Sequence, residues 1–155
     1  MTCLVMSTTK GKSMRNGLIL GSLAAVAITQ AGCATQVKSL PLQLAVQQPA
    51  AGRGVALYFG SQAHPAVKQQ LGDVSYSARV ARGQDGAEAS CNHALEQALD
   101  KLRAAAQQKN ANAVIDVKTR FHDAETSSTT DFTCGVSPSA AAVAVRGDLA
   151  VLQSN

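Results

Sequence analysis

Apolar and polar residues alternate over much of the chain after residue 54, and this alternation predicts strands. The run VALYFG at 55–60 is rich in β-branched and aromatic residues and ends at a glycine, as short strands do. In residues 71–82 apolar side chains recur at every second position, which is the period of a strand with one buried face. Residues 111–121 and 140–152 show the same pattern, and Gly147 inside the last run predicts a bulge or bend.

Between the second and third of these strands, apolar residues recur at intervals of three and four, which is the period of an amphipathic helix. Asp85 and Glu88 have the spacing of a capping box at its start, and Asn110 and Asn112 after Lys109 favour a left-handed exit at its end. The order strand, strand, helix, strand, strand predicts an α+β fold, with one helix packed on one face of a small sheet of about four strands. The expected apolar helix face consists of Cys91, Ala94, Leu95, Ala98, Leu99, Leu102, Ala105 and Ala106.

The strand predicted at 111–121 carries charged residues between its apolar ones. Because successive side chains of a strand point to opposite faces, we expect Asp116, Lys118 and Arg120 on the solvent face of the sheet. We interpret Asp116 and Asp148 as part of that face rather than as an acid–base pair. The expected core positions are Ala113, Ile115, Val117 and Phe121.

The histidines do not indicate an enzyme either. His64 falls in an expected loop, His93 on a helix flank and His122 at a strand end, and no nucleophile motif accompanies any of them. Catalysis needs groups that converge, such as a Ser–His–Asp set or two carboxylates. We therefore predict a protein without enzymatic activity.

A continuous apolar run lies near the N-terminus. GLILGSLAAVAIT at 17–29 follows a basic flank and precedes the small residues AGCA. These three features are typical of a secretory signal peptide, and the run is short for a membrane span. We predict a signal peptide over residues 1–32. Met14 is a plausible true start, because MRNGLILGSLAAVAITQAGC is by itself a complete export signal.

Ala31, Gly32 and Cys33 are similar to the box at which bacterial lipoproteins are cleaved and acylated, although Gln30 stands where an aliphatic residue is usual. We predict that Cys33 carries a covalent lipid. Ala34 after the cysteine resembles the pattern that sorts such proteins to the outer membrane, where the domain would face the periplasm. The alternatives are ordinary cleavage with release into the periplasm, and retention in the cytoplasm.

The segment after Cys33 is rich in Gln and Ala, contains Pro41 and Pro49, and has little charge. We interpret residues 33–53 as the acylated cysteine and a flexible tether, which would reach roughly 60 Å when extended. A partly ordered segment around Leu40 to Val46 is an alternative. The folded domain is predicted at 54–155.

Composition and charge exclude one class of partner. Aromatic residues make up 3% of the chain and tryptophan is absent, so Ala, Val and Leu must fill the core. The formal net charge is +4, but Lys10, Lys12 and Arg15 precede the apolar run. From Cys33 onward eleven basic residues stand against ten acidic ones, and no basic cluster is interleaved with aromatic residues. The sequence thus predicts no nucleic-acid partner.

Cys91 and Cys134 are the cysteines of the predicted domain. In an exported protein an even pair is usually a disulfide, which we predict here. The alternative is a metal site with His93 and His122 as further ligands. Residues two apart on a helix point about 200° apart, so Cys91 and His93 do not readily share one ion. Apart from the lipid on Cys33 we predict no cofactor.

The helix, the segment ANAVIDVKTRF and the segment VAVRGDLAVL with its internal glycine together resemble the small α/β domain shared by two groups of proteins. One is the YbjQ-type family, which is described as heavy-metal-binding, and the other is the RcsF-like lipoproteins, which sense envelope stress at the outer membrane. The resemblance covers roughly residues 54–152. The order of signal peptide, acylated cysteine, tether and domain is similar to the lipoprotein branch.

Under this resemblance, Cys91 and Cys134 look like one of the two disulfides of the lipoprotein branch. The second bridge is absent, since the matching places hold Thr119 and Val145. The resemblance implies an outer-membrane lipoprotein that acts as a non-enzymatic interaction or stress-sensing module, with an envelope protein as partner. The alternative is a periplasmic domain that binds a small ligand or a heavy metal.

Overall fold

The computed structural model describes residues 34–42 and 54–153. These residues all belong to one unit of the chain, Gly32–Asn155. The predicted signal peptide, the possible start at Met14 and the predicted acylation site Cys33 lie outside the described residues. Residues 43–53 of the predicted tether lie outside them too.

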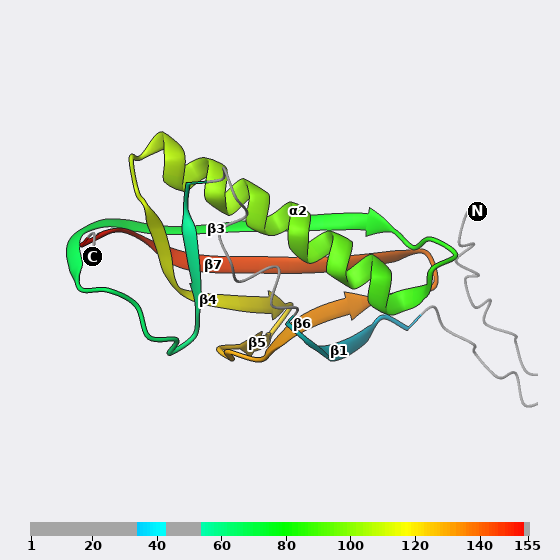
Figure 1. Cartoon of the computed structure of the whole chain (residues 1–155). Helices are drawn as coiled ribbons and strands as arrows, with labels where there is room; N and C mark the ends of the chain where they lie inside the picture. Colours follow the sequence, from blue (N-terminus) through cyan, green and yellow to red (C-terminus); the bar gives the residue numbers. More distant parts are fainter. Residues whose placement is uncertain (1–33, 43–53, 154–155) are drawn as a thin grey trace, which may run out of the picture. The chain divides into compact units, whose positions relative to one another are not determined.

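A mixed sheet and one long helix make up the described part of the chain (Figure 1). Five strands follow one another across the sheet in the order β1-β6-β7-β4-β2, while β3 pairs with β7 and β5 pairs with β4. All pairs are antiparallel except that of β2 with β4. The elements are β1 (Gln36–Pro41), β2 (Ala56–Phe59), β3 (Val67–Ala81), α2 (Gly86–Gln108), β4 (Ala113–Phe121), β5 (Ala124–Thr126), β6 (Asp131–Val136) and β7 (Ala140–Leu152).

The prediction of a sheet of four strands is wrong, because the described residues form a sheet of seven. The four expected strands are present as β2, β3, β4 and β7, and the three unexpected ones are short. β5 has three residues and lies in a segment that reads as a polar loop. β6 contains Thr133, which is buried although it is polar, because its hydroxyl forms a hydrogen bond with the hydroxyl of Thr126. Its N–H donates to Thr119 Oγ1 at 2.9 Å.

The third unexpected strand, β1, corrects the predicted tether. Gln36 to Pro41 pair with β6, from Val136 to Asp131. Leu42 follows as a core residue with 7% exposure, and its N–H donates to the carbonyl oxygen of Thr130 at 2.7 Å. Pro41 is tolerated because it ends an edge strand, where a missing N–H need not cost a ladder hydrogen bond. The folded domain therefore includes residues that precede the predicted boundary at 54.

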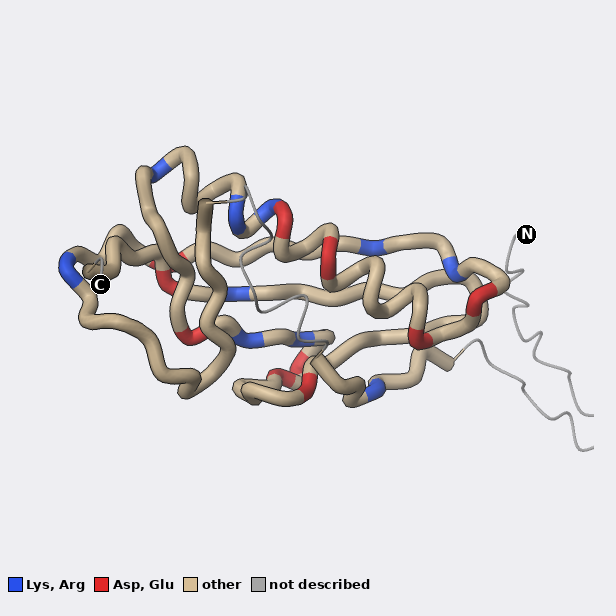
Figure 2. Tube along the Cα trace, viewed as in Figure 1, with Lys and Arg blue, Asp and Glu red and all other residues tan. Residues whose placement is uncertain are grey.

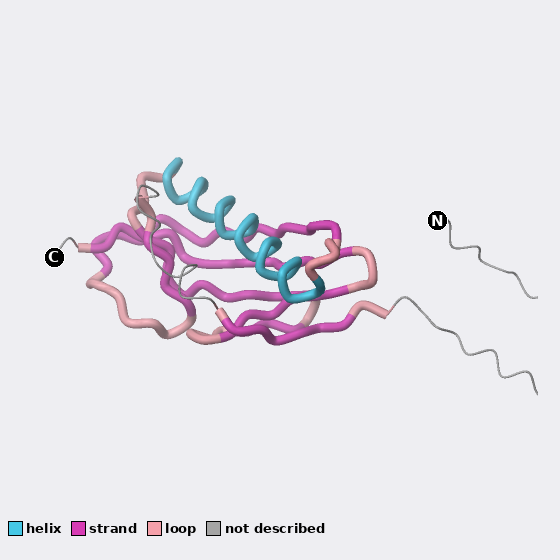
Figure 3. Tube along the Cα trace, turned by 45° about the vertical axis from the view of Figure 1, so that its right-hand side comes forward, coloured by secondary structure: helices cyan, strands magenta, loops and turns pink. Residues whose placement is uncertain are grey.

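The helix α2 lies over one face of the sheet, as expected (Figure 3). It packs mainly on β7 and β3. Its buried residues include Leu95, Leu99 and Leu102, which share one core with Phe59 and Phe132. Within the described ranges, no helix is both long and apolar enough to cross a membrane.

The ends of α2 agree only in part with the prediction. Asn110 has a positive φ of 55°, which is the expected left-handed exit, whereas Asn112 is not among the described residues with a positive φ. Asp85 precedes the first helical residue, but its side chain makes no capping hydrogen bond. Ser90 Oγ instead accepts a hydrogen bond from the N–H of Gly83 at 3.3 Å and donates one to the carbonyl oxygen of Gly86 at 2.9 Å. A side chain one turn into the helix thus holds the incoming loop.

A bulge in β4 changes which residues of this strand face the core. Asp116 has a φ of 49°, and the register against both β7 and β2 shifts by one residue at this point. One extra residue in a strand inverts the alternation of its side chains. Val114 and Val117 therefore both belong to the core under α2, whereas Ala113 and Ile115 pack in a small cluster apart from it. The expectation that Ala113, Ile115, Val117 and Phe121 share one buried face is therefore wrong, since Phe121 is absent from the core under α2 as well.

Gly147 of β7 lies opposite this bulge. A Cβ atom added there would lie 2.6 Å from Val114 Cγ1 and 3.2 Å from the carbonyl oxygen of Ile115. The glycine thus lets the bulged strand approach β7 closely. β7 itself is continuous through Gly147, so the bulge predicted there is wrong, and the extra residue at this point of the sheet is in β4.

Candidate binding groove on the open sheet face

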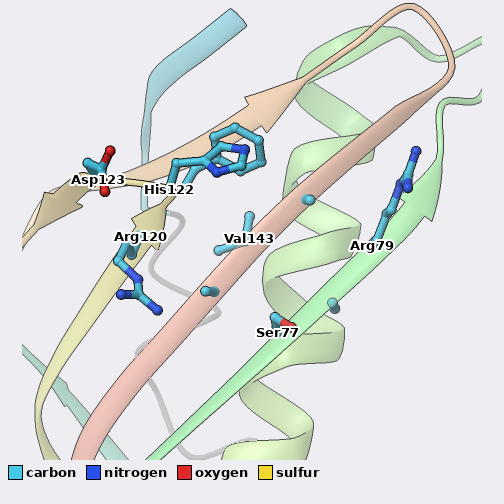
Figure 4. Close-up of a pocket in the computed structure, with 10 residues that line it drawn as sticks. Ser77, Arg79, Arg120, His122, Asp123 and Val143 are labelled. Atoms are coloured by element: carbon cyan, nitrogen blue, oxygen red, sulfur yellow. The ribbon is translucent and has the colours of Figure 1, made fainter. Parts of the chain in front are cut away.

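The face of the sheet opposite α2, here called the open face, carries a shallow groove of about 420 Å³ (Figure 4). Ala142 and Ala144 of β7 form its floor, because these short side chains alternate with the core residues Val143 and Val145. In the sheet register Ala142 pairs with Arg79 of β3, and Ala144 pairs with Arg120 of β4. An arginine therefore flanks the alanine floor on either side of β7.

Arg79 and Arg120 differ from the other cations of the open face. Lys118 Nζ lies 2.8 Å from Asp116 Oδ2, and Arg146 Nη2 lies 3.0 Å from Asp73 Oδ2. Neither the side chain of Arg79 nor that of Arg120 has an ion-pair or hydrogen-bond partner among the described residues. Both side chains are exposed, so their guanidinium groups are free to bind an external acceptor.

Charges of both signs are spread over the strands (Figure 2). The groove differs from this background because its lining includes the two unpaired arginines and one carboxylate, Asp123 in the β4–β5 turn. The remaining polar groups of its lining are Ser77 and His122. This composition suits a ligand with an apolar part and carboxylate or phosphate groups.

Phe121 and His122 border the groove at the end of β4. Their rings meet edge to face, with centroids 4.3 Å apart, and His122 has a positive φ of 50° in the turn. The ring of Phe121 lies over Gly135 of β6, where an added Cβ would come within 2.2 Å of it. Gly135 therefore allows this aromatic ring to lie against the sheet. A second hollow of about 260 Å³ continues from this point, and Arg79 lines both.

The bulge at Asp116 also affects the electrostatics of the open face. The hydrogen bond from Lys118 to Asp116, together with the charge of that carboxylate, raises the pKa of Lys118 above its ordinary value of 10.5. Lys118 thus stays charged, but its charge is neutralised locally by Asp116. The groove next to it keeps the unpaired charge of Arg120.

The structure places the predicted site cysteines in the core, away from the groove. Cys91 of α2 and Cys134 of β6 form a disulfide with an S–S distance of 2.06 Å, and both are fully buried. His93 points away from the core on the exposed side of α2, with its Nε2 3.2 Å from Gln97 Nε2. His122 lies at the open face. Cys33 is outside the described residues.

The alternative metal set of Cys91, His93, His122 and Cys134 is not gathered in one place. Both thiols are used in the disulfide, so neither supplies the thiolate that a metal requires. Within residues 34–42 and 54–153, no group of three or more His, Cys, Asp or Glu side chains is arranged to hold a metal ion. The structure offers no support for that alternative in the described part of the chain.

Sequence reasoning did not find the groove. Arg120 was expected at the solvent face, but Arg79 and the floor residues Ala142 and Ala144 had no assigned role. The alternation AAAVAV in β7 is a signal that alanines occupy one face of this strand. The register of β3 and β4 against β7 is also needed to place an arginine on each side.

The chain matches no protein-family model, no curated protein sequence and no solved structure.

Proposed function

We propose that this protein is a non-enzymatic interaction module of the bacterial envelope, anchored to the outer membrane by a lipid on Cys33 and facing the periplasm. Its open face would bind an envelope protein through the groove between Arg79 and Arg120. The two unpaired guanidinium groups over an alanine floor are the main support for this function. Arginine is enriched in protein interfaces, where its planar group binds carboxylates in a bidentate manner.

The form of the groove favours an extended segment of a partner over a small molecule. It is open along the sheet and continues into the second hollow past Phe121. A small-molecule site usually encloses most of its ligand. A peptide segment with an acidic side chain near each arginine would instead use the length of the groove.

The anchor is tested by labelled palmitate and by separation of inner and outer membranes, with the wild type compared with Cys33→Ala. We expect label on the wild type alone, in the outer-membrane fraction. A soluble, unlabelled periplasmic protein would reject the anchor and would favour the alternative of a periplasmic ligand-binding domain.

The partner surface is tested in cells by a photocrosslinking amino acid at Ser77, which lines the groove and is exposed. The matched control carries the same amino acid at Ala104, an exposed position on α2. We expect a specific envelope protein to be captured from position 77 and not from position 104. Equal capture from both positions, or none from 77, would reject the open face as the binding surface.

A further inference from the structure

The start of β1 fixes how far the domain can lie from its anchor, if Cys33 is acylated as proposed above. Only Ala34 and Thr35 separate Cys33 from Gln36, the first residue of β1. Three residue steps span at most about 11 Å. The predicted tether would have reached roughly 60 Å. The domain is therefore held close to the membrane surface, at the end of the sheet where β1 begins.

Several other elements begin or end at this place, which we call the anchor end. It comprises residues 34–36, the loop 82–85 between β3 and α2, and the turn 137–139 between β6 and β7. Sheet register joins these segments, because Gln36 pairs with Val136 and Ala81 pairs with Ala140. Arg82 links two of them, since its N–H donates to the carbonyl oxygen of Ser139 at 2.9 Å.

Two hollows flank the start of β1 at the anchor end. The one on the open face is the hollow of about 260 Å³, and its lining includes Thr35, Arg79 and His122. The other has a volume of about 140 Å³, and its lining includes Lys38 and Arg82. Neither lining contains a carboxylate. Asp85 and Glu88 follow in the helix start, but they line neither hollow.

We infer that the anchor end lies against the headgroups of the membrane that holds the lipid of Cys33, with Lys38 and Arg82 directed to anionic phospholipids. The short connection keeps Gln36, the first residue of β1, within about 11 Å of the anchor, which is close to the Debye length of about 8 Å at physiological salt. Basic side chains at such a distance are attracted to anionic lipid. This orientation leaves the opposite end of the sheet, at the β2–β3 loop, directed into the periplasm.

The orientation is tested with the full chain, matured in a bacterial envelope and reconstituted in vesicles of phosphatidylethanolamine with a minor fraction of phosphatidylglycerol. A fluorophore is attached to Pro138→Cys at the anchor end or to Ala63→Cys in the β2–β3 loop. β7 runs between these ends and is about 40 Å long for its 13 residues. The chain without an added cysteine gives the labelling background.

We expect a quencher carried on the lipid headgroups to reduce the fluorescence at position 138 and to leave that at position 63 unchanged. The double substitution Lys38→Gln and Arg82→Gln should lower the quenching at 138. Arg146→Gln, in the middle of β7, is the matched control and should not. Vesicles of phosphatidylethanolamine alone should resemble the double variant.

This inference rests on the proposed anchor, and the two can fail separately. Mass spectrometry of the same preparation shows whether the N-terminal cysteine is acylated. Absence of the lipid would reject the anchor and, with it, the orientation. A lipidated protein with equal quenching at 138 and 63 would reject the orientation alone. Quenching at 138 that does not respond to Lys38, Arg82 or lipid charge would reject the role of these basic residues.

Discussion

Cys91 of α2 and Cys134 of β6 are joined by a disulfide whose Cα atoms lie 6.0 Å apart, and this bond connects the helix to the part of the sheet nearest β1. It closes a loop of 43 residues. Chain-entropy reasoning gives such a loop a stabilisation of about 4 kcal/mol. Native proteins have a free energy of unfolding of only about 5–15 kcal/mol, so the disulfide contributes a large share of the stability of this domain.

Removal of this bond by Cys91→Ala with Cys134→Ala should therefore lower the free energy of unfolding by about 4 kcal/mol. We expect the melting temperature, followed by circular dichroism, to fall on the order of 15 °C. Reductant should then have no further effect on the double variant, whereas it should lower the melting temperature of the wild type. A wild type that melts at the same temperature with and without reductant, after its thiols are shown to be free, would contradict the prediction.

Leu42 provides a test of whether the first described residues belong to the domain. Its side chain is 7% exposed and lies in the main core, whereas Val37 of β1 is 52% exposed. Leu42→Ala should cost about 2–4 kcal/mol, as buried leucines usually do. Val37→Ala should change stability by less than about 0.5 kcal/mol. If chemical denaturation gives the same small effect for both, residues 36–42 do not contribute to the folded domain.

The helix and the strands β3, β4 and β7 could be predicted from the sequence because each has a sustained period, whereas β2 was indicated by its β-branched and aromatic residues and the glycine after it. The period of α2 extends over 23 residues, and β3 and β7 have 15 and 13 residues. β1 could not be predicted, because an edge strand of six residues with mostly exposed side chains has no clear alternation. Its burial depends on β6, whose paired residues lie 90 to 100 positions later in the chain, and local patterns do not report such pairing.

Gly147→Ala should destabilise the fold although it adds only one methyl group. The added methyl group would lie 2.6 Å from Val114 Cγ1, in the sheet where the bulge of β4 meets β7. We expect a loss of about 1–3 kcal/mol in the free energy of unfolding, as overpacking of a core usually costs. Gly83→Ala is the matched control, because its added Cβ would have no neighbour closer than 3.9 Å. Comparable denaturation midpoints for the two variants would argue against close packing at Gly147.

The bulge explains why the faces of β4 were predicted only in part. Asp116, Lys118 and Arg120 lie on the open face, as their alternation with apolar residues indicates. Ala113 and Ile115 precede the extra residue and therefore share that side of the strand instead of facing α2. An aspartate in a left-handed conformation looks like any other strand residue in the sequence. The inversion becomes visible only when both neighbouring strands show the same shift in register.

The ion pair of Lys118 with Asp116 should be detectable as a raised pKa of Lys118. Asp116 raises the pKa of Lys118 above 10.5, so the pair stabilises the fold below that pH, and this contribution is lost as the pH rises through the raised pKa. Asp116→Asn keeps a residue type that tolerates the left-handed backbone. NMR titration should give Lys118 a lower pKa in Asp116→Asn than in the wild type. Glu125→Gln, which removes a weaker influence, should change it less.

Arg79 and Arg120 should matter for binding far more than for folding. Both side chains are exposed and have no partner among the described residues, so Arg79→Gln with Arg120→Gln removes no internal ion pair. We expect the melting temperature of this double variant to stay within a few degrees of the wild type. Crosslinking from position 77 to the envelope partner should be lost, because two charge-assisted contacts are absent.

Arg146→Gln is the control for this last prediction, since it also removes a positive charge from the open face. Arg146 is paired with Asp73 at 3.0 Å and does not line the groove of Arg79 and Arg120. Its substitution should leave the crosslink largely intact. If Arg146→Gln abolishes the crosslink as fully as the double variant, the partner responds to the overall charge of the open face. If neither change affects the crosslink, Ser77 lies near a partner that does not use the groove, and recognition by Arg79 and Arg120 is wrong.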